Sequence, residues 1–369
     1  MKNILLLAAN TGRGYISPMN AIYKNLCEKG YAVKVFPRFY EELIPSNQQM
    51  SDFYNLLQRT SFELCKQYAQ MSLLESSISV SSSYLKYWEK PLTDFFRRNI
   101  CDIVISFTPI INKYIIKYLK ENKNFKFYIV VVNIFDPIYP GYDSTGADGY
   151  FVANEIVKNV LKSKGIPDSD IILTGFPLES STRRIGKSNM LNINGIEIKL
   201  PPKIVLVIVC GAQGSIHFIK IIKEIYLKFQ NYFNIIVICG SNQMLYNNIN
   251  NNYKNIYCFE YIDNFNDIIS SADICMTKAA ANTIYQCLYS QTALLVDATK
   301  GFLYQEEGIV EFIKNNNVGE IFYTLEDLDA KINKLISNDF ELYYEWKNTL
   351  SGIHVINGTE NIPNYFCGP

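Results

Sequence analysis

Residues 204–230, IVLVIVCGAQGSIHFIKIIKEIYLKFQ, decide the fold class of this chain. The first six residues are apolar and mostly β-branched, which is typical of a strand covered on both faces. A short glycine loop follows at residues 211–215, and residues 216–230 have the apolar spacing of an amphipathic helix. A buried strand, a glycine loop and a helix in this order predict a parallel sheet with helical crossovers.

The same alternation extends in both directions along the chain. Further strands are predicted at residues 4–9, 33–36, 102–107, 127–133, 151–153 and 171–174, and again at 234–239, 256–259, 274–276, 293–297 and 320–322. The 369 residues exceed what one core usually holds. We therefore predict an α/β fold of two doubly wound Rossmann-like domains that face a central cleft, with the ligand at the carboxyl ends of both sheets.

Composition shifts suggest the domain boundaries. Residues 179–200 are polar and irregular, and two prolines follow them, which is typical of a linker. We predict a first domain at residues 1–178, a linker at 179–202 and a second domain at 203–340. Residues 341–369 are expected to form a helix and a tail that pack back across the domain junction.

Charge and cysteine usage exclude several classes of protein. Lysine plus arginine equals aspartate plus glutamate at 35 each, so no overall basic field indicates a nucleic-acid partner. Nine cysteines without a CxxC pair and only two histidines offer little material for a metal site, and they favour a reducing compartment. The amino-terminal apolar run is short and lacks a cleavage-like site, so we interpret it as a buried strand rather than a signal peptide. A cytoplasmic chain without a membrane span is expected.

The loop at residues 211–215 is the first candidate for chemistry. Its small residues allow backbone N–H groups to approach an anion, and the following helix N-terminus favours negative charge. A diphosphate would suit this site, although many strand-to-helix turns are rich in glycine for steric reasons alone. The loop matches neither the GxGxxG fingerprint nor a Walker loop, which argues against dinucleotide enzymes and nucleoside triphosphatases.

Two later loops repeat this arrangement. The stretch TKAAANTIYQCL, residues 277–288, begins a helix where Lys278 could meet phosphate, Thr283 could donate a hydroxyl and Gln286 could reach a ribose. The alternative is an alanine-rich helix start with a solvated lysine. Gln305 and Glu306 precede another helix and could bind sugar hydroxyls, or they could be an ordinary acidic first turn.

The first half of the chain has its own glycine loop at residues 11–15. Gly12 and Gly14 would allow an acceptor hydroxyl to come close, and Arg13 could bind an anionic group or could simply be a surface residue.

These loops and their order resemble the inverting GT-B glycosyltransferases of family 28. That family includes monogalactosyldiacylglycerol synthases, bacterial diacylglycerol glucosyltransferases and the N-acetylglucosaminyltransferase of peptidoglycan synthesis. The similarity extends from about residue 3 to residue 319 and rests on an ordered set of short motifs. They are RGYISP at 13–18, CDIVIS at 101–106, GFP at 175–177, GAQGS at 211–215, CGSN at 239–242, the stretch 261–288, and the stretch from Gln305 to Gly319.

The resemblance implies a function and a site. It implies transfer of a sugar from a UDP-sugar to the hydroxyl of a lipid or small molecule, with inversion, no cofactor and no catalytic metal. The implied UDP-sugar ligands are Gly211, Gln213, Gly214, Ser215, Gly240, Asn242, Lys278, Asn282 and Thr283, with the backbone of Ile262 on uracil, Gln286 on ribose, and Gln305 and Glu306 on the sugar. Helix N-termini and backbone amides would stabilise the leaving diphosphate.

Three positions depart from the family pattern. The histidine of the first loop is Tyr15 here, and a tyrosine, with its pKa near 10, is poorly suited to base chemistry at neutral pH. The customary ribose-binding glutamate is Gln286, and the PGG triplet is three alanines at residues 279–281. The candidate catalytic residues are therefore Tyr15, Asp136 and His217, although Asp136 could merely start a turn and His217 could lie on a helix surface.

The departures leave other functions open. A catalytically degenerate relative that binds ligands or a partner subunit is one alternative, and a GT-B-like sugar-nucleotide epimerase is another. The stretch YLKYWEKPLTDFFRR, residues 84–98, mixes aromatic and basic residues and could lie on an anionic membrane. It could equally be a buried helix whose basic side chains reach the solvent.

Overall fold

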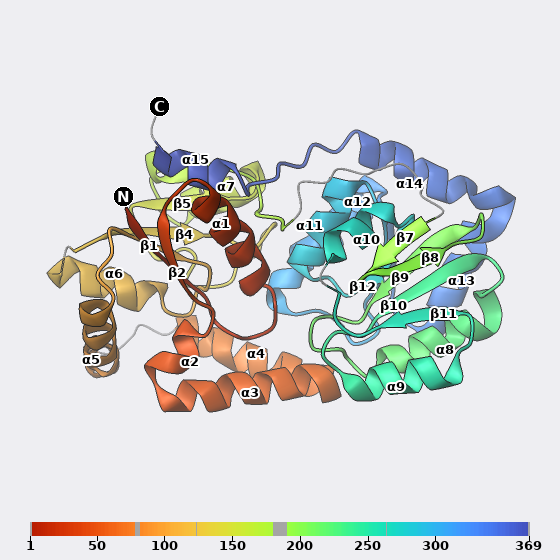
Figure 1. Ribbon diagram of the computed structural model, residues 1–369, viewed down its shortest axis with the longest axis horizontal. Helices are drawn as coiled ribbons and strands as arrows, with labels where there is room; N and C mark the ends of the chain where they lie inside the picture. The colour runs from red at the N-terminus through yellow and green to blue at the C-terminus, as the bar shows by residue number, and fades with distance from the viewer. Residues whose placement is uncertain (1, 78–81, 123, 180–189, 263, 368–369) are drawn as a thin grey trace. The chain divides into compact units, whose positions relative to one another are not determined.

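The computed structural model describes residues 2–77, 82–122, 124–179, 190–262 and 264–367, and their side chains except those of residues 74–86 and 367. The chain divides into two compact units (Figure 1). Unit 1 comprises Met1–Asn55, Gln67–Glu179 and Ile356–Pro369, and unit 2 comprises Leu56–Lys66 and Ser180–Val355.

Unit 1 is built on a parallel sheet. Among its described residues, six strands follow the order β2-β1-β3-β4-β5-β6. The strands are β1 (Asn3–Leu7), β2 (Ala32–Phe36), β3 (Ile103–Ser106), β4 (Lys126–Val130), β5 (Gly149–Val152) and β6 (Ile171–Leu173). The helices are α1 (Ile16–Glu28), α2 (Phe39–Leu43), α5 (Ser82–Arg98), α6 (Asn112–Glu121), α7 (Glu155–Ser163) and α15 (Asn361–Cys367), together with parts of α3 (Pro45–Thr60) and α4 (Phe62–Ser77). β3 and β5 are buried throughout.

Unit 2 has the same kind of sheet. Its described strands follow the order β11-β10-β9-β12-β13-β14, all parallel. They are β9 (Ile204–Val209), β10 (Phe233–Ile238), β11 (Ile256–Phe259), β12 (Ile274–Thr277), β13 (Ala293–Asp297) and β14 (Gly319–Phe322). The helices are α8 (Phe218–Phe229), α9 (Gln243–Asn252), α10 (Phe265–Ser271), α11 (Ala281–Ser290), α12 (Glu307–Asn316), α13 (Leu325–Ile336) and α14 (Glu341–Ser351). The predicted α/β class with two parallel sheets is confirmed.

Strand order fixes where each unit can bind a ligand. In unit 2, the chain moves from β9 to one side and then crosses back to β12 on the other side. The crevice at the carboxyl ends of β9 and β12 is therefore the switch point of this sheet, where doubly wound proteins bind ligands. In unit 1 the same reversal occurs between β1 and β3. The glycine loops at residues 211–215 and 11–15 each follow the strand at the switch point.

The region expected to be an irregular linker contains a β-hairpin. β7 (Met190–Ile193) pairs with β8 (Ile196–Lys199) in an antiparallel ladder. Asn194 and Gly195, at φ 50° and 83°, form the turn, because an Asn-Gly pair readily adopts the positive φ angles of a two-residue hairpin loop. The alternating pattern around Asn-Gly was a readable signal. The hairpin packs on unit 2, where Asn194 Nδ2 donates to the carbonyl of Tyr261 at 2.9 Å.

Helix α5 favours the buried-helix interpretation of residues 84–98. Trp88, Leu92 and Phe96 lie four residues apart and are all buried, and Trp88 stacks on Tyr114 with ring centroids 4.7 Å apart. The side chains of Tyr84 and Lys86 lie outside the described residues. In the described part of the chain, no helix is long and apolar enough to cross a membrane.

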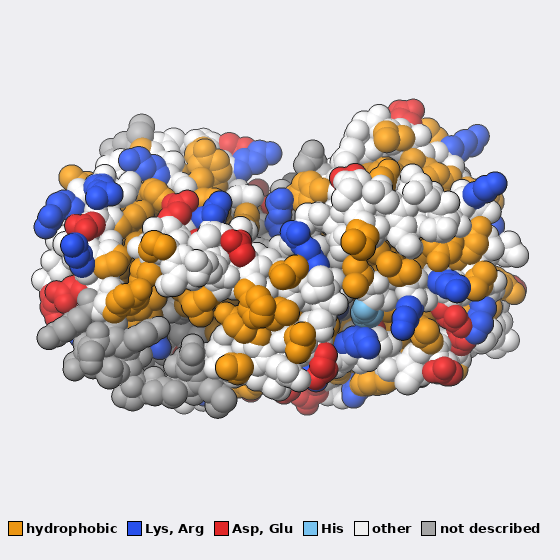
Figure 2. Space-filling view, turned by 90° about the horizontal axis from the view of Figure 1, so that it is seen from below, with side chains coloured by type: hydrophobic (Ala, Val, Ile, Leu, Met, Phe, Trp, Pro, Cys, Tyr) orange, Lys and Arg blue, Asp and Glu red, His pale blue; other side chains and the backbone are white. Residues whose placement is uncertain are grey.

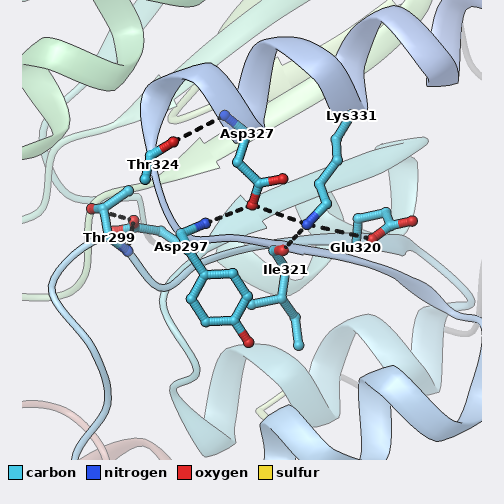
Figure 3. A network of polar contacts seen from close by, with 8 residues as sticks. Asp297, Thr299, Glu320, Ile321, Thr324, Asp327 and Lys331 are labelled. Atoms are coloured by element: carbon cyan, nitrogen blue, oxygen red, sulfur yellow. Dashed lines mark hydrogen bonds and ion pairs between the residues drawn. The ribbon is translucent and has the colours of Figure 1, made fainter.

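Side-chain networks hold the last strands and helices of unit 2. Lys331 of α13 binds Asp327 at 3.0 Å, Glu320 of β14 at 3.8 Å and the carbonyl of Ile321, which joins α13 to the edge strand (Figure 3). Deeper in the unit, the hydroxyl of Tyr343 in α14 donates to Asp273 Oδ1 at 2.6 Å. The other oxygen of Asp273 accepts from the backbone N–H of Val205 at 2.9 Å, so this carboxylate ties α14 to the start of β9.

We expect Tyr343→Phe to lower the free energy of unfolding by about 1–2 kcal/mol, because it removes a hydrogen bond to a buried carboxylate. Chemical denaturation of the full chain would measure the change. Tyr344→Phe is the matched control, since that side chain is exposed and its substitution should leave the transition in place. Equal effects of the two substitutions would show that the Asp273 contact contributes nothing to stability.

Candidate functional site

Two glycine loops of unit 2 interlock at the carboxyl edge of its sheet. A Cβ on Gly214, at φ 72°, would lie 2.1 Å from the carbonyl oxygen of Cys239. A Cβ on Gly240, at φ 62°, would lie 2.4 Å from the carbonyl oxygen of Gly211. Only glycine allows the two backbones to approach this closely. The loop after β9 and the loop after β10 are therefore one rigid structure.

Asn242 and Ser241 fasten this pair of loops. Asn242 Nδ2 donates to the carbonyl of Gly214 at 2.6 Å, while its Oδ1 accepts from the N–H of Leu245 at 3.2 Å and caps α9. The backbone N–H of Ser241 donates to the carbonyl of Ala212 at 3.0 Å. The N-terminus of α9 is thus fixed beside the glycine loop, and a helix N-terminus favours a bound anion.

Lys278 brings a positive charge to the same edge. It follows β12, on the other side of the switch point, and its Cε lies 3.6 Å from where a Cβ of Gly211 would be. Its ammonium lies over the ring of Phe62, 5.8 Å from the centroid. The structure therefore brings Lys278, from the loop after β12, close to Gly211 in the loop after β9.

Gln305 and Glu306 contribute buried acceptor oxygens. They belong to the short helix η2 (Tyr304–Glu306), which follows β13. The Oε2 atom of Glu306 accepts from the N–H of Leu303 at 2.9 Å. Burial raises the pKa of Glu306, and the positive charge of Lys278 opposes that shift. Gln305 Oε1 is buried and has no hydrogen-bond partner among the described residues, so a ligand hydroxyl that donated to it would satisfy it.

Helix α11 carries the next group of predicted ligands. Asn282 is half-buried at its start, and Thr283 is 9% exposed. Gln286 is only 1% exposed, and its Nε2 donates to Ser290 Oγ at 2.8 Å. Its side chain therefore faces the interior of unit 2, and its role on ribose stays a prediction. Ile262, after β11, is also buried, which leaves its backbone as the group for a uracil contact.

His217 contacts a buried carboxyl group, a pairing that sequence reasoning missed. Its Nε2 lies 2.7 Å from Asp297 Oδ2, at the end of β13. Thr299 donates to Asp297 Oδ1 at 2.7 Å (Figure 3). Burial lowers the pKa of His217, and Lys300, Lys220 and Lys278 lower it further, while Asp297 acts in the opposite direction. Burial likewise raises the pKa of Asp297, and His217 opposes the shift. His217 is thus not a free residue on a helix surface.

In unit 1 the loop at residues 11–15 follows β1. Arg13 and Gly14 are exposed, Gly12 is buried, and Tyr15 is half-buried directly before α1. Burial raises the pKa of Tyr15 well above its usual 10, with a smaller repulsive contribution from Tyr139. Its hydroxyl is therefore protonated at neutral pH and is a poor base.

Asp136 lies in the segment between β4 and β5 of unit 1, and its side chain is exposed. Tyr139, three residues later, donates its N–H to Asn133 Oδ1 at 3.0 Å, which closes the turn that contains Asp136. Tyr139 also contributes electrostatically to the raised pKa of Tyr15, so these two tyrosines lie on the same side of unit 1.

Two further residues at these edges had no readable signal. Glu41 of α2 is buried, and its Oε1 accepts from the N–H of Asn10 at 2.9 Å and from Ser51 Oγ at 2.6 Å, so it holds the loop after β1. Arg59 of α3 donates from Nε to Gln213 Oε1 at 2.9 Å. Both contacts join residues far apart in the sequence, and Arg59 and Gln213 are separated by 154 positions.

Comparisons with known proteins agree with this arrangement. Residues 18–178 match the family described as monogalactosyldiacylglycerol (MGDG) synthase, and residues 205–348 match the glycosyltransferase family 28 C-terminal domain. Similar curated proteins include processive diacylglycerol beta-glucosyltransferases. The one from Bacillus licheniformis is 23% identical over 98% of this chain and 93% of its own length. The one from Bacillus pumilus is 24% identical with the same coverage.

Solved structures show the same fold at low identity. MurG from Acinetobacter baumannii matches with a TM-score of 0.61 and 14% identity, covering 99% of each chain. A UDP-GlcNAc 2-epimerase from Neisseria meningitidis, bound to UDP-GlcNAc, matches with a TM-score of 0.58 and 13% identity, covering 100% of this chain and 98% of the other.

We expect Glu306→Gln to raise the melting temperature, and the gain to grow with pH. Because burial raises the pKa of Glu306 above 4.5, its contribution to stability is present below that pH and is lost as the pH rises through the folded-state value. Thermal unfolding of wild type and variant at about pH 5 and about pH 7.5 would measure the difference. The exposed neighbour Glu307→Gln is the control. If the gain in melting temperature became smaller as the pH rose, the buried charge of Glu306 would not be destabilising and the prediction would be wrong.

Proposed function

Because the chain belongs to the GT-B glycosyltransferases of family 28, we propose that it transfers a sugar from a UDP-sugar to a lipid hydroxyl with inversion at the anomeric carbon. The observation that carries the proposal is the pair of interlocked glycine loops beside Lys278 at the switch point of unit 2. Residues 211–215 and 239–242 contain no acidic side chain. A site of N–H groups and cations suits a diphosphate.

The sugar of the UDP-sugar would lie at η2. The unpartnered Gln305 Oε1 and the second oxygen of Glu306 are acceptors, which hydroxyl groups can satisfy by donating. Acceptors at η2 and hydrogen-bond donors at the glycine loops match the two ends of a nucleotide sugar. A sugar-nucleotide epimerase would use the same two features, so turnover has to separate the two functions.

The names of the relatives supply the acceptor class, since the similar Bacillus proteins are diacylglycerol glucosyltransferases. Met50, Phe53 and Leu56 are exposed on α3 at intervals of three residues, so they share one face of this helix. Figure 2 shows hydrophobic side chains on the lower side of the molecule, where α3 lies in Figure 1. This face would rest on the surface of the membrane that holds the lipid acceptor.

The reaction requires a base and a stabilised leaving group. The acceptor hydroxyl loses its proton to the base as its oxygen attacks the anomeric carbon, and the bond from that carbon to the diphosphate oxygen breaks. The N–H groups of Gly214, Ser215 and Ser241 already donate to backbone carbonyls. Lys278 and the remaining N–H groups of the glycine loops would stabilise the negative charge on UDP. Asp136 is our proposed base, because it is an exposed carboxylate in the turn that also carries Tyr139, which acts electrostatically on Tyr15. Tyr15, with its raised pKa, would position the hydroxyl.

A panel of UDP-sugars with diacylglycerol vesicles and small-molecule acceptors, followed by UDP release, tests the function. Acceptor-dependent UDP release with an inverted product is the expected result. Binding of UDP-sugar without turnover would favour a binding or partner subunit, and an epimerised UDP-sugar without acceptor would favour the epimerase. No UDP binding at millimolar nucleotide would overturn the proposed donor.

We expect Thr283→Val to weaken UDP binding by roughly 10-fold, since it replaces a hydroxyl at the start of α11 by a methyl group of similar shape. Calorimetric titration with UDP would measure this loss. Thr283→Ser keeps the hydroxyl and should bind nearly as tightly as wild type. Weak binding by both variants would indicate a packing defect instead.

We expect Asp136→Asn to leave UDP affinity unchanged and to lower turnover by roughly 100-fold or more, because the amide cannot accept the proton. His217→Asn is the comparison variant, since it removes the other candidate base. If Asp136→Asn retained full activity while His217→Asn lost it, the base would be His217 and its partner Asp297.

A further inference from the structure

The end of α3 and the start of α4 pack on the loops of the UDP-sugar site. Although the flanking residues belong to unit 1, Leu56–Lys66 belongs to unit 2. The carbonyl of Arg59 accepts from the N–H of Ile216 at 3.1 Å, at the end of the loop after β9. Phe62 lies under the ammonium group of Lys278. This segment therefore contacts both loops that border the switch point.

The guanidinium of Arg59 bridges the two interlocked glycine loops. Its Nε donates to Gln213 Oε1 at 2.9 Å, and its Nη2 donates to Ser241 Oγ at 3.3 Å. An arginine has five N–H donors, so these two bonds leave three donors for another acceptor. The side chain is half-buried.

These contacts leave side-chain hydrogen-bond donors beside the two glycine loops. Because Gln213 Oε1 already accepts from Arg59, its remaining side-chain group is the amide NH₂. Arg59 adds its three remaining N–H groups and its charge, and Lys278 adds an ammonium at Gly211. Residues 211–215 and 239–242 supply no acidic side chain, whereas the buried Glu306 interacts electrostatically with Lys278. Together these donors complement an anion with several acceptor oxygens.

We propose that Arg59 is a diphosphate-binding residue, supplied to the UDP-sugar site by the α3–α4 segment. This inference rests on the proposed function. The planar guanidinium would bind two oxygens of the diphosphate, and its bonds to Gln213 and Ser241 orient it for that contact. As the bond to the sugar breaks, charge accumulates on the diphosphate, so Arg59 and Lys278 would both stabilise the leaving group.

Binding of UDP, UMP and uridine to the full chain tests this role by calorimetry. The variants are Arg59→Gln, Arg59→Lys and the control Lys254→Gln. Lys254 is exposed and precedes β11, so it lies at the opposite edge of the sheet and its substitution makes the same change in net charge. Arg59→Gln should weaken UDP binding by roughly 10- to 100-fold and leave uridine binding unchanged. Arg59→Lys, which keeps the charge without the planar fork, should recover part of the loss.

The nucleoside series separates this role from a structural one. If Arg59 only tethered the loops, Arg59→Gln would weaken UDP and uridine by the same factor, and the inference would be wrong. It would also be wrong if the variant kept the wild-type preference for UDP over uridine. Failure of the wild-type chain to bind UDP would instead overturn the proposed function. Unchanged uridine binding by Arg59→Gln confirms that the variant is folded.

Discussion

The interlocked backbones at Gly214 and Gly240 are the contact on which the site depends. A side chain at either position would collide with a carbonyl oxygen of the other loop. This close backbone contact places the loop after β9 against the N-terminal cap of α9. Arg59 and Lys278 lie beside the same pair of loops. The parallel sheet adds the second constraint, because it brings the ends of β9, β10, β12 and β13 to one edge.

Several ionisable side chains are buried around this edge of the sheet, where burial disfavours their charged forms. Burial raises the pKa of Glu306 and Asp297 and lowers that of His217. Each shift is a free-energy cost that packing elsewhere in unit 2 has to offset. Perturbed groups that converge on one edge are typical of binding and catalytic sites. The His217–Asp297 pair has the geometry of an oriented imidazole, and it is the main rival to Asp136 as the base.

The loop at residues 11–15 of unit 1, where we expect the acceptor, differs from the glycine loops of unit 2. In unit 1, burial raises the pKa of Tyr15 and removes it as a base. Glu41 accepts a hydrogen bond from the backbone N–H of Asn10, which fixes the start of that loop. The hydrogen bonds of unit 2 join several of the residues that we propose to bind the UDP-sugar, whereas in unit 1 the proposed base rests on the position of Asp136.

The sequence alone determined the two parallel sheets, because uniformly apolar strands that alternate with amphipathic helices allow few other folds. It also determined the order of the glycine loops, since glycine and other turn residues are recognisable from the local sequence. The Asn194–Gly195 hairpin was equally local and could have been predicted. Tertiary structure decided which distant residues meet. Arg59 reaches Gln213, His217 reaches Asp297, and Gln286 turns inward to Ser290. The contacts of Arg59 and His217 join chain segments that are distant in the sequence, so no local pattern could predict them. The direction of Gln286 depends on the side chains that pack around α11, which a local pattern does not specify either.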